Sequence, residues 1–198
     1  MLIIEGPDLV GKTTLISALV EHLNRCRKRF KTNPGDILVD RFGLAEVDDM
    51  EDQVQARARR WCIFDRCYPS EIIYGLRCRE QSNISPMAVI RMNHMLAQKH
   101  GMVVIIYADE DAYERLIDLH HSRGENFNPE QCRRVNAAYR QLAKTGSIDD
   151  YVVGVADSFC VEINFDGALG TLMYPAKTAA FVKRIVETYT NRQLAYEK

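Results

Sequence analysis

Several features that mark particular protein classes are missing from this sequence. The six cysteines form no CxxC pair, and no histidine cluster accompanies them at the spacing of a zinc site. We therefore expect reduced, mostly buried thiols, as in a cytoplasmic protein. No apolar run approaches membrane-spanning length, and the first such run ends at Glu5. We accordingly expect neither a membrane span nor a signal peptide.

The sequence also lacks an excess of charge of either sign. Lys and Arg total 26 against 27 for Asp and Glu, which gives a net charge of −1 at pH 7. A dedicated nucleic-acid binder usually carries a basic excess, so long-lived DNA or RNA binding is not favoured. The length of 198 residues, 46% of them hydrophobic, predicts a single domain that spans residues 1–198.

The strongest functional signal lies at the start of the chain. An apolar run at 2–5, LIIE, leads into GPDLVGKT at 6–13, the pattern of a phosphate-binding loop. A glycine-rich turn lets backbone N–H groups converge on phosphate oxygens, and a following helix adds its positive end. Lys12 can then reach the β- and γ-phosphates, and Thr13 can hold Mg²⁺. The alternative is an ordinary glycine turn, but a strand before it and an amphipathic helix after it favour nucleotide binding.

Predicted strands and helices alternate along the chain. We expect strands at 2–5, 37–40, 61–65, 102–107 and 158–165, and helices at 13–29, 46–60, 70–78, 85–99, 109–119, 129–143 and 175–194. This alternation predicts an α/β fold in which helices cover both faces of a parallel sheet. Ligands of such folds bind at the carboxyl ends of the strands, where Glu5 and Asp65 lie.

Three further groups are candidates for chemistry. Asp65 can hold Mg²⁺, directly or through water, or accept a proton, and Arg66 can bind a substrate phosphate; the alternative is a strand-end salt bridge. The polar segment at about 120–130 carries Arg123 and suits a lid that closes over ATP, although it can equally be an exposed loop. Asp8 suits a sugar hydroxyl better than ATP, or it stabilises the turn by a local hydrogen bond.

At these positions the chain resembles the thymidylate kinase family of nucleoside monophosphate kinases. Residues 4–14, IEGPDLVGKTT, are similar to that family's phosphate loop, and residues 65–74, DRCYPSEIIY, to its DR-x-x-x-S-x-x-AY motif. Residues 123–130, RGENFNPE, look like the end of its lid motif. The resemblance implies a P-loop NTPase fold of three α/β/α layers, with a central parallel five-stranded sheet and a short lid.

The resemblance also implies roles for individual residues. Catalysis would fall to Lys12, Asp65, Arg66 and Arg123. Mg²⁺ would be held by Thr13 and Asp65. The ATP phosphates would be bound by Gly6, Asp8, Val10, Gly11, Lys12, Thr13 and Thr14. The acceptor would be bound by Asp8, Arg57, Arg66, Ser70 and Tyr74.

The sequence departs from the family's pattern mainly where the acceptor is recognised. The family's REPGG stretch is reduced to TNPG at 32–35, and Asn128 stands where a second lid arginine is expected. We still expect a cytoplasmic, Mg²⁺-dependent kinase that transfers phosphate from ATP to a small nucleotide. The expected acceptor is a deoxynucleoside monophosphate, dTMP or a modified pyrimidine analogue. The family is commonly dimeric.

Two alternatives stay open. In the first, the acceptor is a deoxynucleoside, or a modified base in DNA as in 5-hydroxymethyluracil DNA kinases; the near-neutral charge argues against a DNA substrate. In the second, the protein is a non-catalytic nucleotide switch, although the NKxD motif of GTP switches is absent.

Overall fold

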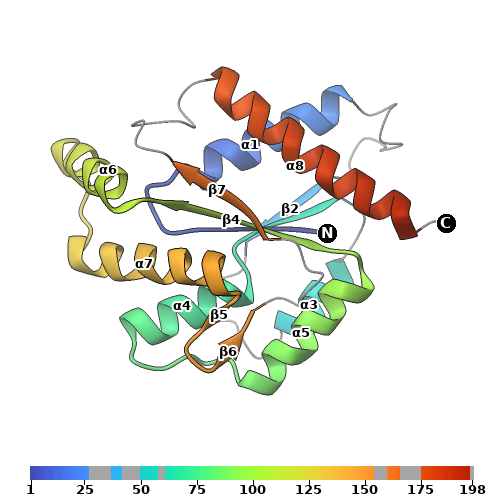
Figure 1. The fold of residues 1–198 in the computed structure, drawn as a ribbon, viewed down its shortest axis with the longest axis horizontal. Helices are drawn as coiled ribbons and strands as arrows, with labels where there is room; N and C mark the ends of the chain where they lie inside the picture. The colour runs from blue at the N-terminus through green and yellow to red at the C-terminus, as the bar shows by residue number, and fades with distance from the viewer. Residues whose placement is uncertain (27–36, 42–49, 58–60, 154–159, 166–174, 197–198) are drawn as a thin grey trace.

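A computed structural model describes residues 1–26, 37–41, 50–57, 61–153, 160–165 and 175–196. Its elements follow the alternation expected from the sequence (Figure 1). The strands are β1 (Leu2–Glu5), β2 (Leu38–Arg41), β3 (Cys62–Asp65), β4 (Met102–Ala108), β5 (Ser147–Ile148), β6 (Tyr151–Val152) and β7 (Cys160–Phe165). The helices are α1 (Lys12–Arg25), α3 (Met50–Arg57), α4 (Tyr68–Cys78), α5 (Pro86–Gln98), α6 (Glu110–Ser122), α7 (Pro129–Thr145) and α8 (Pro175–Tyr196).

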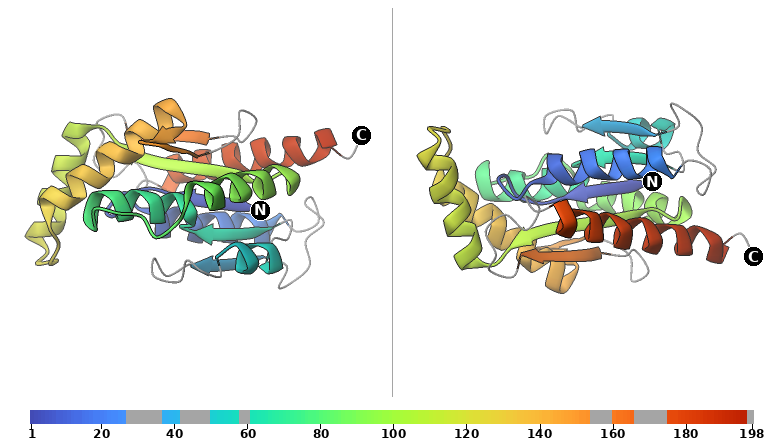
Figure 2. Two further views of the ribbon diagram at one scale, coloured as in Figure 1. Left: turned by 90° about the horizontal axis from the view of Figure 1, so that it is seen from below. Right: turned by 90° about the horizontal axis from the view of Figure 1, so that it is seen from above.

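The main sheet has five strands in the order β2-β3-β1-β4-β7, and every neighbouring pair is parallel. Figure 1 shows α1 and α8 on one side of this sheet and α3, α4 and α5 on the other, and Figure 2 shows the sheet from each of these two faces. This three-layer arrangement is compatible with a P-loop type of nucleotide-binding fold. α1 ends at Arg25 with Cys26 as its C-cap, short of the Arg29 expected from the sequence, and residues 27–29 lie outside the described residues.

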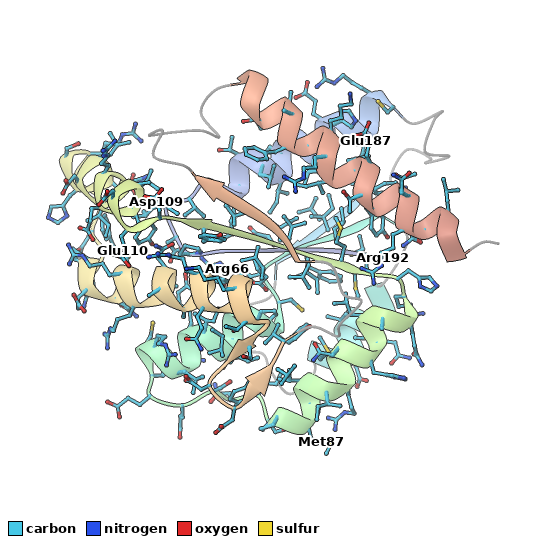
Figure 3. All side chains as sticks on the ribbon, in the orientation of Figure 1. Arg66, Met87, Asp109, Glu110, Glu187 and Arg192 are labelled. Atoms are coloured by element: carbon cyan, nitrogen blue, oxygen red, sulfur yellow. The ribbon has the colours of Figure 1, made fainter. Side chains whose placement is uncertain are left out.

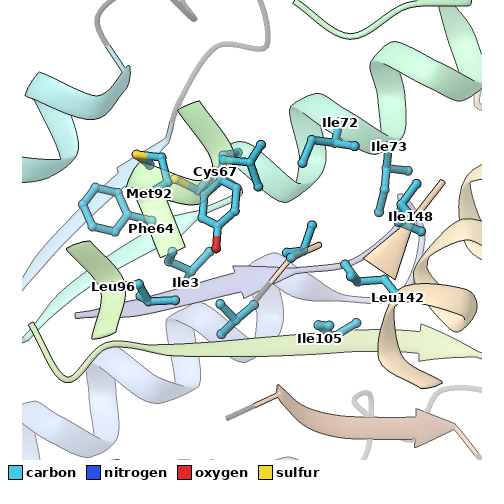
Figure 4. Packing of buried hydrophobic residues seen from close by; sticks show 14 of the residues in the cluster. Ile3, Phe64, Cys67, Ile72, Ile73, Met92, Leu96, Ile105, Leu142 and Ile148 are labelled. Atoms are coloured by element: carbon cyan, nitrogen blue, oxygen red, sulfur yellow. The ribbon is translucent and has the colours of Figure 1, made fainter. Parts of the chain in front are cut away.

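Alternate side chains of each central strand point to opposite faces of the sheet and belong to two separate hydrophobic cores. Leu2 and Ile4 of β1 pack with α1, α6 and α8, whereas Met1 and Ile3 pack with α4, α5 and α7. The apolar run of β4 is buried along its whole length for the same reason, because both faces are covered. Figure 4 shows Ile3 and Ile105 among side chains of the second core. The paired cores hold the strand ends in fixed register.

A small antiparallel hairpin, β5–β6, was not expected from the sequence. The hairpin follows directly after Gly146, which ends α7 in the left-handed conformation. Asp149 in its turn accepts two hydrogen bonds from Arg77 of α4, at 2.9 and 3.1 Å. Asn93 of α5 donates to the Val152 carbonyl at 2.8 Å. Tertiary contacts of this kind stabilise two-residue strands that have too little local signal to be predicted.

No helix within the described parts of the chain combines the length and apolar character needed to cross a membrane.

Candidate functional site

The candidate residues gather where the parallel strands end. β1 ends at Glu5 and β3 at Asp65, and these paired strands place Ile4 opposite Asp65. The Arg66 N–H donates to the Ile4 carbonyl at 3.0 Å, which ties the turn after β3 to the end of β1. In Figure 3 Arg66 lies between the central strands and α7, inside the molecule. The phosphate-loop sequence and the Asp65–Arg66 pair therefore share one edge of the sheet.

The loop at 6–11 requires glycine at both ends. Gly6 has φ +157°, and a Cβ there would lie 2.5 Å from the Ile106 carbonyl oxygen of β4. Gly11, with φ +84°, is the N-cap of α1 and offers no side-chain acceptor to its first turn. In contrast, α5, α6 and α7 each begin with a side-chain cap. The N-terminus of α1 therefore keeps N–H groups available for an anion.

Substituting Gly6 by Ala tests this close approach. The added methyl group would overlap a backbone carbonyl, so we expect a loss of about 2 kcal/mol or more in the free energy of unfolding, measured by urea denaturation. Gly124→Ala is the matched control, because Gly124 also has positive φ but would place its Cβ in open space. Equal losses in the two variants would show that backbone conformation alone, and not the contact with β4, requires glycine at position 6.

Lys12 lies almost entirely inside the loop, with 8% of its surface exposed. Its Nζ donates to the Pro7 carbonyl at 2.6 Å. Burial and then the nearby charge of Arg66 lower the Lys12 pKa to about 7, against the attraction of neighbouring carboxylates. A buried ammonium group under this penalty is stabilised by any anion that enters the loop. Thr13 and Thr14, which follow it, are exposed, whereas the Val10 side chain is buried in the core.

Arg66 is held in a conformation that is uncommon for a residue with a side chain, with φ +72°. Its side chain is 5% exposed and pairs with the Asp8 carboxylate of the loop. The guanidinium also lies over the Tyr74 ring, 4.6 Å from the centroid. Burial opposes the charge of Arg66, but Tyr139, Tyr74 and Asp8 together raise its pKa. Arg66 is therefore a permanent cation facing the loop.

Glu5, the residue before the loop, accepts the hydrogen bonds of a buried network. The carboxylate accepts hydrogen bonds from the Cys67 N–H at 2.7 Å, the Ser70 hydroxyl at 2.5 Å and the Tyr139 hydroxyl at 2.9 Å. Burial raises the Glu5 pKa, and these donors oppose the rise. Ser70 is fully buried in this network. Its hydroxyl thus supports Glu5, and the expected contact of Ser70 with an acceptor stays a prediction.

Asp65 and Thr13 line one cavity of about 580 Å³ beside α1. Asp65 Oδ1 is buried and has no hydrogen-bond partner among the described residues. A carboxylate oxygen without a partner next to a hydroxyl suits Mg²⁺, which takes few protein ligands and completes its shell with water and phosphate oxygens. No group of three or more His, Cys, Asp or Glu side chains that could hold a metal ion occurs within the described part of the chain. The two residues thus fit Mg²⁺ bound together with a phosphate.

The connection between α6 and α7 is shorter than the segment at about 120–130 that was predicted to be a lid. α6 continues to Ser122, so the connection to α7 contains only 123–128. Arg123 is exposed at the end of α6. Glu125 lies 2.8 Å from His120 Nδ1, and Phe127 makes an edge contact with the His121 ring. These contacts, and histidines near the helix C-terminus, stabilise the last turn of α6. The helix end was predicted too early because the polar composition of the segment is typical of a loop.

Other predicted residues are only partly covered by the structure. Arg57 is the last residue of α3, and its side chain lies outside the described residues, as does the whole stretch 32–35. Tyr74 lies at the cleft, where its hydroxyl donates to Asp8 at 2.9 Å. The structure changes the expected end of α6, and the roles expected of Arg57, Ser70 and Tyr74 stay predictions.

A second, smaller cavity adjoins Asp8, and two of its residues, Asp8 and Tyr74, were predicted to contact the acceptor. It measures about 170 Å³ and is lined by Asp8, Tyr74, Tyr113, Phe127, Asn128, Gln131, Cys132 and Val135. The Tyr113 hydroxyl donates to the Asp8 carbonyl at 3.0 Å, which fixes the loop against α6. Tyr113 and Tyr139 were missed because aromatic residues on the apolar face of a helix usually belong to the core.

Comparisons with known proteins show the fold but no family. No protein-family model matches the sequence, and no curated protein sequence matches it. Among solved structures, the YorR protein from Bacillus subtilis, determined in complex with phosphorylated GDP, is similar to this chain with a TM-score of 0.64. The alignment covers 100% of this chain and 98% of YorR at 14% sequence identity. The two chains therefore share a fold over their full lengths.

Proposed function

We propose that this protein catalyses Mg²⁺·ATP-dependent phosphoryl transfer to a deoxynucleoside monophosphate, with dTMP or a modified pyrimidine nucleotide as the acceptor. The observation that carries the proposal is a pair of buried cations near the carboxyl ends of the strands, Lys12 of the loop and Arg66, which pairs with Asp8. A kinase must bind two phosphate groups close together, and two buried cations suit two anions. The fold shared with YorR, which was determined with a bound nucleotide, supports the proposal.

The donor ATP would bind at the phosphate loop. Backbone N–H groups from Gly6 to Gly11 and the N-terminus of α1 would bind its phosphates, and Lys12 would supply positive charge at the transferred group. Thr13 and Asp65 would hold Mg²⁺, which neutralises charge on the phosphate oxygens when bound. The oxygen at Asp65 Oδ1 that lacks a described partner supports this assignment.

The acceptor would bind on the opposite side of Asp8. Arg66 would bind the acceptor phosphate, and Asp8 and Tyr74 would contact its sugar. Arg123 is exposed, and a movement of the connection at 123–128 would bring it to a bound nucleotide.

A panel assay tests the proposed activity. The purified protein would be incubated with labelled Mg²⁺·ATP and each deoxynucleoside monophosphate, each deoxynucleoside, and an oligonucleotide that contains 5-hydroxymethyluracil. Transfer to a monophosphate supports the proposal. Transfer only to a nucleoside or to DNA would replace the acceptor class, and hydrolysis without transfer to any acceptor would favour a nucleotide switch.

The Lys12 pKa of about 7 predicts that triphosphate binding depends on pH. Bound phosphates favour the charged lysine, so above pH 7 the protein must take up a proton on binding. Affinity should therefore fall as pH rises from 7.5 to 9, by up to about tenfold per unit. The terminal phosphate is already ionised in this range. Calorimetry of a non-hydrolysable ATP analogue in two buffers of different ionisation enthalpy would measure the proton uptake. Lys12→Met should bind weakly without that uptake, and an unchanged uptake in this variant would assign the proton to another group.

A further inference from the structure

The Asp8 carboxylate is already paired with Arg66, the cation that would bind an acceptor phosphate. One carboxylate oxygen of Asp8 accepts a hydrogen bond from Arg66 Nη2, and the other accepts one from the Tyr74 hydroxyl at 2.9 Å. The Asp8 side chain is 54% exposed, whereas that of Arg66 is 5% exposed. Of the two paired side chains, Asp8 is therefore the one that solvent anions reach.

Loss of Asp8 would leave Arg66 without an ion-pair partner among the described residues. The Arg66 side chain is 5% exposed, and a buried guanidinium without a partner costs several kcal/mol (order of magnitude). A neutral nucleoside brings only hydroxyl and amide groups, which cannot compensate this charge. A phosphate group can, because it brings negative charge and several acceptor oxygens.

Arg66 also has unused hydrogen-bonding capacity. Its Nε is buried and has no hydrogen-bond partner among the described residues. A phosphate can accept from two guanidinium nitrogens at once, whereas Asp8 accepts from one in the described structure. The exchange of Asp8 for a phosphate would therefore add a hydrogen bond.

We propose that Asp8 is a resident anion on Arg66, which an acceptor displaces only if it brings an oxyanion of its own. This inference rests on the proposed function and states how its site would select acceptors that carry a phosphate. The exchange selects phosphate-bearing acceptors over nucleosides, and it releases the Asp8 carboxylate to accept a hydrogen bond from another part of the same acceptor. Binding of the acceptor phosphate and contact with its hydroxyl are thus coupled through a single side chain.

Binding of inorganic phosphate to the full-length protein tests the exchange without any catalytic step. Calorimetry would compare four proteins: wild type, Asp8→Asn, Arg66→Met and the double variant. Asp8→Asn removes the negative charge that is paired with Arg66. It should tighten phosphate binding about tenfold in the protein that keeps Arg66, and less than about twofold in the Arg66→Met background.

Asp8→Glu and Tyr74→Phe supply evidence if Arg66→Met does not fold. Asp8→Glu keeps the competing charge and should bind phosphate within about twofold of wild type. Tyr74→Phe removes one hydrogen bond to Asp8 and should tighten phosphate binding about two- to threefold. Equal tightening by Asp8→Asn with and without Arg66 would overturn the exchange, as would no tightening in either Asp8→Asn or Tyr74→Phe.

Failure of the exchange and failure of the proposed activity are distinguishable. Phosphoryl transfer to a monophosphate by a protein whose phosphate affinity does not respond to Asp8→Asn would overturn the exchange alone. The predicted phosphate pattern in a protein that transfers no phosphoryl group would overturn the activity and leave the exchange standing.

Discussion

Replacing Lys12 by Met is expected to reduce phosphoryl transfer about 100- to 1,000-fold, because the loop loses the one side-chain charge that it presents to the transferred phosphate. The measurement is kcat/KM for ATP in a coupled or radiolabel assay. Methionine has similar length and no charge, so it fills the same space inside the loop. The loss should therefore come from electrostatics and not from a collapsed loop.

The stability of this variant provides the second half of the test. Lys12 is buried, and burial lowers its pKa, so the folded protein carries a penalty for the charged amine. Removing the amine should leave the thermal midpoint unchanged or raise it. The control is Lys144→Met, which removes an exposed lysine from α7 and should alter neither property. A Lys12→Met enzyme with near-normal kcat/KM would remove Lys12 from the proposed mechanism.

Replacing Arg66 by Met is expected to have the other large effect, about a 100-fold loss in kcat/KM for the acceptor with ATP affinity changed less than about threefold. Arg66 lies outside the loop and pairs with Asp8, so its loss removes the proposed cation for the acceptor and leaves the residues of the donor site in place. The repulsion that helps lower the Lys12 pKa is lost as well, so ATP affinity should not fall at pH 8.

Arg77→Met is the matched control for this substitution. Arg77 belongs to the neighbouring helix α4, and it pairs with Asp149 of the hairpin, away from the loop. Arg77→Met should lower the free energy of unfolding by no more than about 1 kcal/mol and leave kcat/KM for both substrates unchanged. If Arg66→Met weakened ATP binding more than acceptor turnover, the two substrate sites would have to be exchanged.

The sequence predicted the alternation of strands and helices because the signals are strong and local. Continuous apolar runs such as β4 occur where a parallel strand is covered on both faces, and Ser85 caps a helix that Pro86 begins. The position of the phosphate loop and of the Asp65–Arg66 pair followed from the same alternation. These features depend on residues that are close together in the chain.

Contacts between distant residues could not be predicted in this way. The Arg66–Asp8 pair spans 58 positions, and the hydrogen bond from Tyr139 to Glu5 spans 134. Neither has a periodicity or motif that marks it. The buried position of Ser70 was missed for the same reason, because a serine in the first turn of a helix is usually exposed.

The carboxylate of Glu5 joins four parts of the chain, since its donors come from the turn after β3, from α4 and from α7. Removing one partner of a buried charged group costs more than replacing the whole set by apolar residues. Substitutions at positions 5, 70 and 139 should therefore be coupled in evolution. In homologous sequences we expect these three residues to be inherited together or replaced together, and single departures to be purged.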